Sequence, residues 1–184
     1  MRYLFEKAEN LTKRRPENMA SSITSKILEI RKESIKKSMG DLHTMSHRQQ
    51  YVDTVNGAMY YDDSQAENVN ATWFTFENIV NPVIWIVGGT CHNNYSELID
   101  TARKNVKAII SLGEEKENIE MTFQGAVREF HNASSIEDAV NKASLIAQKN
   151  DVVLFSPACK DQEMNYSDRG DTFVREVHKL NEGK

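Results

Sequence analysis

Two adjacent carboxylates are the first residues in this sequence whose position suggests chemistry. Asp62-Asp63-Ser64 directly follows a β-rich run. Carboxylates at the end of a strand can accept hydrogen bonds from ribose hydroxyls or bind a divalent cation. A solvated turn followed by a helix cap explains the same residues equally well. The motif therefore predicts a polar site and leaves its ligand open.

Arg48 and a glycine pair are the next candidates. Arg48 stands just before the same β-rich run and could contact a phosphate or stack on a base, whereas a plain surface arginine is the simpler interpretation. Gly88-Gly89-Thr90 follows an apolar run and would let the backbone approach a ligand closely, although a tight turn needs the same residues. Neither GxGxxG nor GxxxxGK[ST] occurs, so we predict no phosphate-binding loop.

Residues suited to metal binding or nucleophilic catalysis carry weaker signals. Cys91, His92 and Cys159 fall near the ends of predicted strands, but their spacing matches no zinc motif, and we expect reduced thiols, although the sequence is compatible with a single bridge. Ser156 has no GxSxG around it, so positioning or capping is the better interpretation than nucleophilic attack. We predict no metal site and no catalytic residue.

A sheet of mostly parallel strands would bring these candidates together. Three apolar runs resemble strands buried on both faces, at 83–87, 106–112 and 152–155, with a shorter candidate at 126–130. Helical patterns separate or follow them, at 96–104, 114–121, 134–148 and 168–180. The third of these helices should open with the capping box Ser134-x-x-Glu137. Ligands bind at the carboxyl ends of such strands, where the candidate residues stand.

The N-terminal part predicts a long helix and a hairpin before this α/β pattern. Apolar residues recur at helical spacing from Pro16 to Gly40. Asn56-Gly57 between two β-rich runs, 51–55 and 58–61, is a strong hairpin signal, and a further helix should follow Asp62-Asp63-Ser64 and run to about residue 80. The predicted fold class is α/β: a Rossmann-like, mostly parallel sheet flanked by helices, with an N-terminal β-hairpin and a preceding long helix.

Composition excludes several classes of function. The 184 residues are 39% hydrophobic and 27% charged, with a net charge of −4 that offers no general attraction for nucleic acid. The longest apolar run, 82–89, is far shorter than the roughly 20 residues of a membrane span. We expect a cytoplasmic protein with neither nucleic acid nor membrane as a partner. The role of residues 1–15 cannot be read from the sequence.

The motifs taken in order resemble one known family. The series comprises His47-Arg48, the hairpin, Asp62-Asp63-Ser64-x-Ala66-x-Asn68-Val69, Ile86-Val87-Gly88-Gly89-Thr90, Leu154-Phe155-Ser156-Pro157-Ala158-Cys159 and Asp168-Arg169-Gly170-Asp171-Thr172-Phe173. It resembles the Mur ligase family, in particular its D-glutamate-adding members, over about residues 16–181. The resemblance implies that 1–40 is an arm and helix similar to the end of the central ATP-binding domain, and that 41–184 is the C-terminal, Rossmann-like domain.

The same resemblance implies an activity for the full-length relatives. They are ADP-forming acid–amino acid ligases of peptidoglycan biosynthesis, and hence of cell wall growth, cell shape and cell division. With ATP and Mg²⁺ they activate the carboxylate of UDP-MurNAc-L-alanine as an acyl phosphate, which the amine of D-glutamate attacks. By resemblance, Arg48 and Asp63 are nucleotide-binding residues, and Ser156 helps to hold the incoming amino acid.

Several positions depart from the family pattern. Family members usually carry Lys where Gln65 stands, Thr where Glu67 stands, and Lys in the loop that here contains His92, so Gln65 and His92 are substrate-site candidates of altered chemistry. After Cys159 the chain is also about two residues shorter than the family pattern. Losing a charge-assisted contact costs about 1.5–3 kcal/mol. The departures weigh against D-glutamate as a partner.

The sequence thus predicts the C-terminal domain of a D-glutamate-adding ligase that is not active alone. Its partners would be the N-terminal and central ligase domains and ATP or ADP, and the chain alone would hold no cofactor. A noncatalytic nucleotide- or partner-binding module that keeps the fold is the alternative. A relative in fold alone, with an unrelated ligand, is the third hypothesis.

Overall fold

The structure is a computed structural model that describes residues 24–27, 29–30, 33–34, 46–90, 93–161 and 164–182. The chain divides into two units, Met1–Gly40 and Asp41–Lys184. In the first unit the described residues are helical, and the remainder of the helix predicted from Pro16 to Gly40 lies outside the described residues. The second unit carries the sheet and the candidate site.

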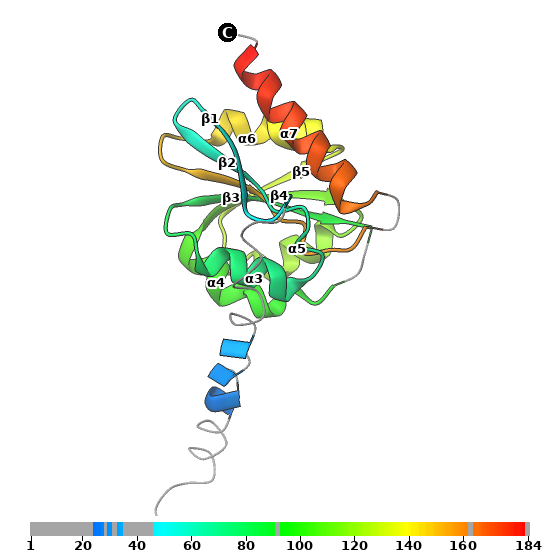
Figure 1. The fold of residues 1–184 in the computed structure, drawn as a ribbon. Coiled ribbons are helices and arrows are strands. Elements are labelled where there is room, and N and C mark those ends of the chain that lie inside the picture. The colour runs from blue at the N-terminus through cyan, green and yellow to red at the C-terminus, as the bar shows by residue number, and fades with distance from the viewer. Residues whose placement is uncertain are drawn as a thin grey trace, which may run out of the picture. The chain divides into compact units, whose positions relative to one another are not determined.

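A six-stranded mixed sheet forms the centre of the second unit, in the order β1-β2-β6-β3-β4-β5 (Figure 1). The strands are β1 (Gln50–Val55), β2 (Ala58–Asp62), β3 (Val83–Gly89), β4 (Val106–Gly113), β5 (Glu129–Ala133) and β6 (Val152–Phe155). β1 and β2 form the predicted antiparallel hairpin, and all other pairings are parallel. Asn56 and Gly57 have φ values of 53° and 83°, the conformation that a two-residue hairpin turn requires. The prediction of a mostly parallel sheet that begins with a hairpin is confirmed.

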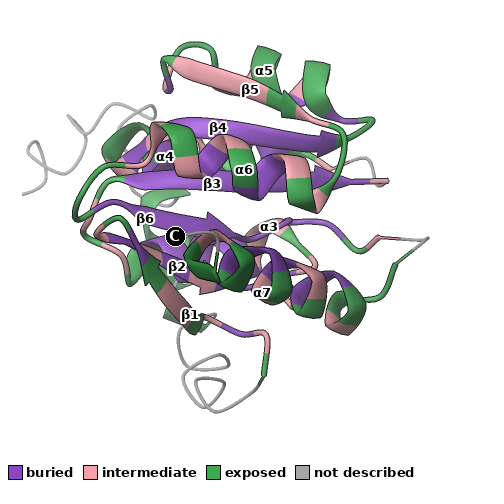
Figure 2. Cartoon of the chain, turned by 90° about the horizontal axis from the view of Figure 1, so that it is seen from above, coloured by how far each residue is buried: buried purple, intermediate pink, exposed green. Residues whose placement is uncertain are grey.

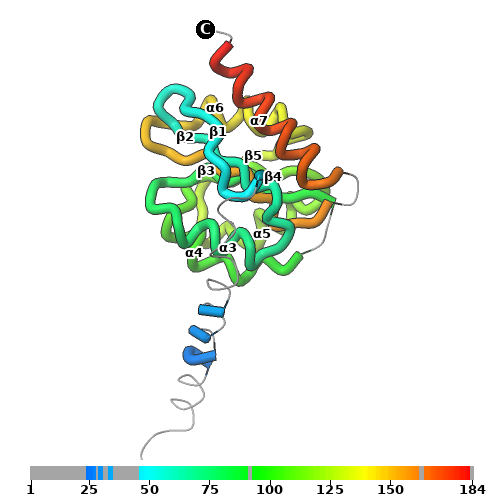
Figure 3. Tube along the Cα trace, viewed as in Figure 1, coloured from blue at the N-terminus to red at the C-terminus, as the bar shows by residue number. Residues whose placement is uncertain are grey.

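Helices cover both faces of the sheet (Figures 1 and 2). One face carries α3 (Val69–Glu77), η2 (Tyr95–Leu98), α4 (Ile99–Asn105) and α5 (Lys116–Phe123). The other carries α6 (Ile136–Ile146) and α7 (Tyr166–Glu182), which pack against each other. The tube in Figure 3 shows α7 running beside the hairpin, and α7 contacts both β1 and β2. The central strands are consequently buried on both sides, as their uninterrupted apolar sequences require.

Aromatic side chains fill the two interfaces between sheet and helices. Trp85 of β3 lies edge-on between Phe76 and Phe123, with ring centroids 5.0 and 5.4 Å apart. On the opposite face Phe155 of β6 stacks on Phe173 of α7 at 5.1 Å. Such pairs add about 0.5–1.5 kcal/mol each to the burial of their surface. They fix α3, α5 and α7 against the strands whose ends form the candidate site.

Local structure differs from the prediction at several element boundaries. The strand predicted at 126–130 lies at Glu129–Ala133 because the amides of Ala126 and Val127 both bond to the carbonyl of Phe123 and finish the turn of α5. The cap of α6 is Ser135 and not Ser134: its hydroxyl accepts from the amide of Asp138 at 3.1 Å.

Two further expectations need correction. α3 begins at Val69, later than the predicted helix, and Asn68 caps it through a 2.9 Å bond from the amide of Ala71. Cys159 is disulfide-bonded, against the expectation of a reduced thiol. Within the part of the chain that the structure describes, none of the helices combines the length and apolarity needed to cross a membrane.

Gly113, the last residue of β4, provides a test of the close approach between β3 and β4. Its φ is 72°, and an added Cβ would overlap the carbonyl oxygen of Gly89. Gly113→Ala should therefore lower the free energy of unfolding by about 1–3 kcal/mol, measured by urea denaturation. Gly125→Ala is the control, because a Cβ there meets nothing within 4 Å; it should change stability by less than about 0.5 kcal/mol. Equal losses of stability in both variants would contradict this account of how closely β3 and β4 approach each other.

Candidate functional site

The carboxyl ends of the parallel strands open into one groove. Its lining includes the glycines at the end of β3, the end of β4, the N-terminus of α6 and the first turns of α7. The volume is about 590 Å³. Gly88 has a φ of 108°, and an added Cβ would overlap the carbonyl oxygen of Leu112, so only glycine allows β3 and β4 to approach each other so closely here. The expected convergence of the segments after β3 and β4 is present.

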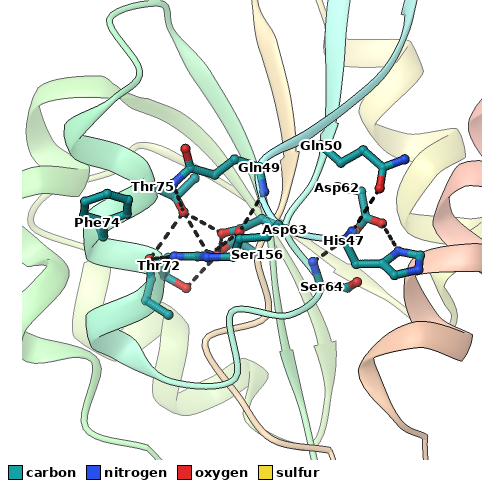
Figure 4. Close-up of polar contacts among 12 residues, drawn as sticks. His47, Gln49, Gln50, Asp62, Asp63, Ser64, Thr72, Phe74, Thr75 and Ser156 are labelled. Atoms are coloured by element: carbon teal, nitrogen blue, oxygen red, sulfur yellow. Dashed lines mark hydrogen bonds and ion pairs between the residues drawn. The ribbon is translucent and has the colours of Figure 1, made fainter. Parts of the chain in front are cut away.

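A buried polar network lies beside this edge and joins three of the predicted site residues (Figure 4). The Arg48 guanidinium donates to the Asp63 carboxylate, and Arg48 and Asp63 are 3% and 0% exposed. The other oxygen of Asp63 accepts from the hydroxyl of Thr75 at 2.7 Å and from that of Ser156 at 2.8 Å. The hydroxyls of Thr72 and Ser156 share a further bond of 2.8 Å. Both carboxylate oxygens of Asp63 therefore accept hydrogen bonds.

The network ties together segments that are distant in the sequence. Arg48 also donates to the carbonyl of Ala71 at 3.0 Å and to the hydroxyl of Thr75 at 3.2 Å, so it reaches α3. The carbonyl of Ser156 accepts from the indole nitrogen of Trp85 at 2.7 Å. A buried charge is tolerated only when it is paired and hydrogen-bonded. The pair thus fixes the segment before β1, the end of β2, α3 and the turn after β6 in one arrangement.

The electrostatic balance of Asp63 reflects its burial. Burial raises the pKa of Asp63, while the Arg48 guanidinium and the hydroxyls of Thr75 and Ser156 act in the opposite direction. Without Arg48, no cation of the network would oppose the effect of burial on the pKa of Asp63. The arrangement is therefore suited to hold one guanidinium and one carboxylate together, and neither group is open to bulk solvent.

A second polar cluster lies on the other side of the segment 62–64 (Figure 4). His47 Nδ1 lies 2.6 Å from an oxygen of the buried Asp62, and His47 Nε2 lies 3.7 Å from Asp171 of α7. The amide of Ser64 donates to Asp62 at 2.9 Å. A Cβ added to Gly170 of α7 would overlap the side chains of His47 and Ser64. The missing side chain at Gly170 lets α7 approach this segment.

The remaining predicted site residues are Gln65, which lies near His47, and His92. The amide of Gln65 donates to the carbonyl of His47 at 3.0 Å, and its side-chain oxygen is buried without a partner. His92 lies outside the described residues, as does Cys91. Among the residues that the structure does describe, no group of three or more His, Cys, Asp or Glu side chains could hold a metal ion.

Sequence reasoning assigned no role to His47, Thr72, Thr75 or Arg169, all of which join these clusters. Thr72 and Thr75 are three residues apart on α3 and so face the same side of the helix. Two threonines at that spacing among apolar residues are the signal that could have identified them. Arg169 donates to the carbonyl of Ser64 at 2.6 Å and is buried, which nothing in its sequence surroundings indicates.

Comparison with known proteins identifies what this arrangement is similar to. The family model described as Mur ligase, glutamate ligase domain, matches residues 47–159. The chain is 37% identical over 166 residues to the UDP-N-acetylmuramoylalanine--D-glutamate ligase of Salinibacter ruber, a match that covers 89% of this chain and 36% of that protein. For the ligase of the same name from Bacillus subtilis the values are 34% over 151 residues, 80% and 34%. The chain thus spans about a third of the length of these curated relatives.

Solved structures share the fold at low sequence identity. The MurF ligase of Thermotoga maritima in complex with ADP superposes with a TM-score of 0.52 at 16% identity, covering 79% of this chain and 36% of that one. The MurC ligase of the same organism gives a TM-score of 0.52 at 12% identity, with coverages of 82% and 36%. These similarities concern the fold alone.

Breaking the buried ion pair should destabilise the domain strongly. Arg48→Met and Asp63→Asn should each lower the free energy of unfolding, Arg48→Met by about 3–5 kcal/mol because it leaves Asp63 buried without its cation. The double variant should lose less than the sum of the single losses, with a coupling of about 0.5–3 kcal/mol in urea denaturation.

The control for this cycle is Arg103→Met. Arg103 pairs with Asp100 at 3.0 Å on the surface, where the two side chains are 56% and 88% exposed. It should change the free energy of unfolding by no more than about 1 kcal/mol. Additive losses at Arg48 and Asp63 would show that the two residues do not act as a pair.

Proposed function

The chain belongs to the Mur ligase family, and from this membership we propose that it serves as the C-terminal domain of an ATP-dependent amide ligase of peptidoglycan-precursor synthesis. The observation that carries the proposal is the single network formed by Arg48, Asp63 and Ser156. These are the three residues that the resemblance assigned to nucleotide and substrate. They come from three separate segments, and one edge of the sheet unites them.

We propose that Arg48 and Asp63 contribute to nucleotide binding. Because their charged groups bond to one another, their first effect is to hold the segment after β2 and the start of α3 in position. Arg48 keeps 3% of its surface exposed, so direct contact with ATP or ADP is confined to that small edge while the pair is closed. ATP and Mg²⁺ would be held mainly by the other ligase domains, in a cytoplasmic enzyme, with this domain closing over them.

Ser156, Gln65 and His92 are proposed to face the incoming amino acid. The buried Ser156 hydroxyl donates to Asp63 and is bonded to Thr72, so contact with a substrate carboxylate would require the bond to Asp63 to break. Gln65 replaces a lysine of the family pattern, and its buried side-chain oxygen has no partner. D-glutamate carries two carboxylates, and the loss of a cation at this position weakens the case for it as the substrate.

A noncatalytic module that binds a nucleotide or a protein partner is the second candidate. It is favoured by the contrast between an intact Arg48–Asp63 pair and the uncharged Gln65 at a lysine position of the family pattern. Such a module would keep the fold and the pair without transferring D-glutamate.

The test is reconstitution of amide formation. The chain would be assayed for ADP release, with UDP-MurNAc-L-alanine and D-glutamate, first by itself and then joined to N-terminal and central domains of a D-glutamate-adding ligase. The proposal predicts no release from the chain alone and substrate-dependent release from the joined protein. Arg48→Lys should reduce that release by about tenfold or more, because a lysine cannot reproduce the forked guanidinium contacts.

Arg103→Lys is the matched control and should leave ADP release unchanged, since Arg103 is exposed and remote from the network. ADP binding without amide formation in the joined protein would favour the noncatalytic module. Turnover by the chain alone, or full activity of Arg48→Lys, would refute the proposed role.

A further inference from the structure

Arg48 stands on a stretch of backbone in a conformation that most residues avoid. The residues on either side of it, His47 and Gln49, have φ values of 61° and 48°, in the left-handed region. A residue other than glycine keeps this conformation where surrounding contacts compensate its cost. The contacts that hold His47 and Gln49 therefore also determine where the guanidinium of Arg48 lies.

The contacts of Gln49 belong to the buried network of Arg48 and Asp63. Its amide donates to an oxygen of Asp63 at 3.2 Å, and its side-chain nitrogen donates to the hydroxyl of Thr75, also at 3.2 Å. One flank of Arg48 is thus held from within the network that Arg48 itself forms. The other flank, His47, is held by a different set of contacts.

His47 is bonded to the segment 62–65 through both its side chain and its main chain. Its Nδ1 lies 2.6 Å from the Asp62 carboxylate, and because a carboxylate accepts but cannot donate, Nδ1 is the donor. The carbonyl of His47 accepts from the amide of Gln65 at 3.0 Å. The other oxygen of Asp62 accepts from the amide of Ser64 at 2.9 Å, so Asp62 is itself fixed. The side chain of His47 is 11% exposed and that of Asp62 is fully buried, so water competes little for the bond between them.

Two adjacent carboxylates hold two adjacent residues, on opposite sides of the end of β2. Asp63 accepts from Arg48, which reaches α3, and Asp62 accepts from His47, which lies against Gly170 of α7 (Figure 4). Successive side chains of an extended chain point to opposite faces, so 62–63 can engage both residues at once. The bond between His47 and Asp62 is not part of the buried ion pair, yet it fixes the same two stretches of backbone.

The imidazole of His47 is also confined by α7. The ring of Tyr166 meets it edge-on, with the ring centroids 6.3 Å apart. Its Nε2 lies 3.7 Å from the carboxylate of Asp171, which is 70% exposed. These contacts limit the space of the ring without adding a second short bond. The orientation of the imidazole therefore depends on its bond to Asp62.

We propose that His47 is a positioning residue for nucleotide binding: its bond to Asp62 holds the left-handed backbone beside Arg48 and so keeps the guanidinium on Asp63. The inference rests on the proposed function, because that function gives Arg48 a nucleotide to bind. His47 acts through Arg48 and does not itself touch the nucleotide. The role requires a donor at the place of Nδ1, on a residue that accepts a positive φ. A side chain that merely filled space would need neither.

Asparagine is the conservative replacement that meets both requirements. Its Nδ2 is separated from Cα by the same number of bonds as Nδ1 of histidine, and asparagine is among the residues that tolerate the left-handed region best. His47→Asn should therefore keep what His47→Ala loses. His131→Ala is the matched control, because His131 also lies beside a carboxylate, that of Glu129 at 2.9 Å, but on β5 at the other edge of the sheet.

The first measurement is hydrogen exchange of the Arg48 guanidinium protons in the ¹⁵N-labelled 184-residue chain, with the signal assigned by its loss in Arg48→Lys. His47→Ala should speed this exchange by about tenfold or more, because the bond from Arg48 to Asp63 opens more often. His47→Asn and His131→Ala should stay within about threefold of the parent chain. Unchanged exchange in His47→Ala would overturn the proposal.

The second measurement is the KM for ATP and the kcat of ADP release by the protein joined to the other ligase domains. His47→Ala should raise the KM by about tenfold and change kcat by less than about threefold, because Arg48 contributes to binding. His47→Asn should restore the KM to within about threefold of the parent value. A residue needed for folding alone would lower the apparent kcat and leave the KM of the folded fraction unchanged, and that result would overturn the inference, as would a KM that His47→Asn does not restore.

Asp62→Asn decides the question if His47→Ala is poorly folded. It replaces the charged acceptor of the His47 bond by a neutral amide, so it should raise the KM for ATP in the same direction but by less. Where the double variant folds, it should show less than the product of the two single increases, since both changes weaken one bond. An unchanged KM in Asp62→Asn, or fully multiplicative increases, would overturn the inference.

The two measurements separate this inference from the proposed function, because the exchange experiment involves neither nucleotide nor any other ligase domain. ADP release from the joined protein together with unchanged Arg48 exchange in His47→Ala would reject the role of His47 and leave the ligase function standing. Faster exchange in His47→Ala without ADP release from the joined parent protein would support the hold of His47 on Arg48 and reject the ligase function.

Discussion

The ion pair between Arg48 and Asp63 is the constraint on which this site depends. Both groups are withdrawn from water, and each is stable there only because the other, together with neighbouring hydroxyls and a carbonyl, satisfies its hydrogen bonds. This requirement fixes the relative positions of the segment before β1, the end of β2 and α3. The Ser156 hydroxyl extends the same constraint to β6, which lies between β2 and β3 in the sheet.

Close backbone approach is the second condition for the groove. Gly88 and Gly113 let β3 and β4 end tightly against each other, and Gly170 lets α7 reach the loop after β2. The approach of α7 carries Arg169 to the carbonyl of Ser64 and to the groove. The buried Arg48–Asp63 pair and Arg169 thus both involve one short segment, 62–65. This segment connects the ion pair with the groove.

The centre of the sheet could be predicted because β3 and β6 are uninterrupted apolar runs, and the hairpin because Asn56-Gly57 favours one turn. β5 was displaced by three residues because Val127 looks like a strand residue but completes the turn of α5. The burial of Arg48 could not be read from the sequence, since a surface arginine and a paired buried arginine have the same local pattern. Its partner lies 15 residues away, and only the register of the hairpin brings the two together.

A crystal structure of this chain joined to a central ligase domain, with ADP and Mg²⁺ bound, tests the central claim most directly. The account predicts that the nucleotide lies against the segments that the Arg48–Asp63 pair holds, with Arg48 or a neighbour in 47–75 within hydrogen-bonding distance of it. A nucleotide bound with no contact to any of these residues would contradict the account, and would reduce the pair to a purely structural element of the fold.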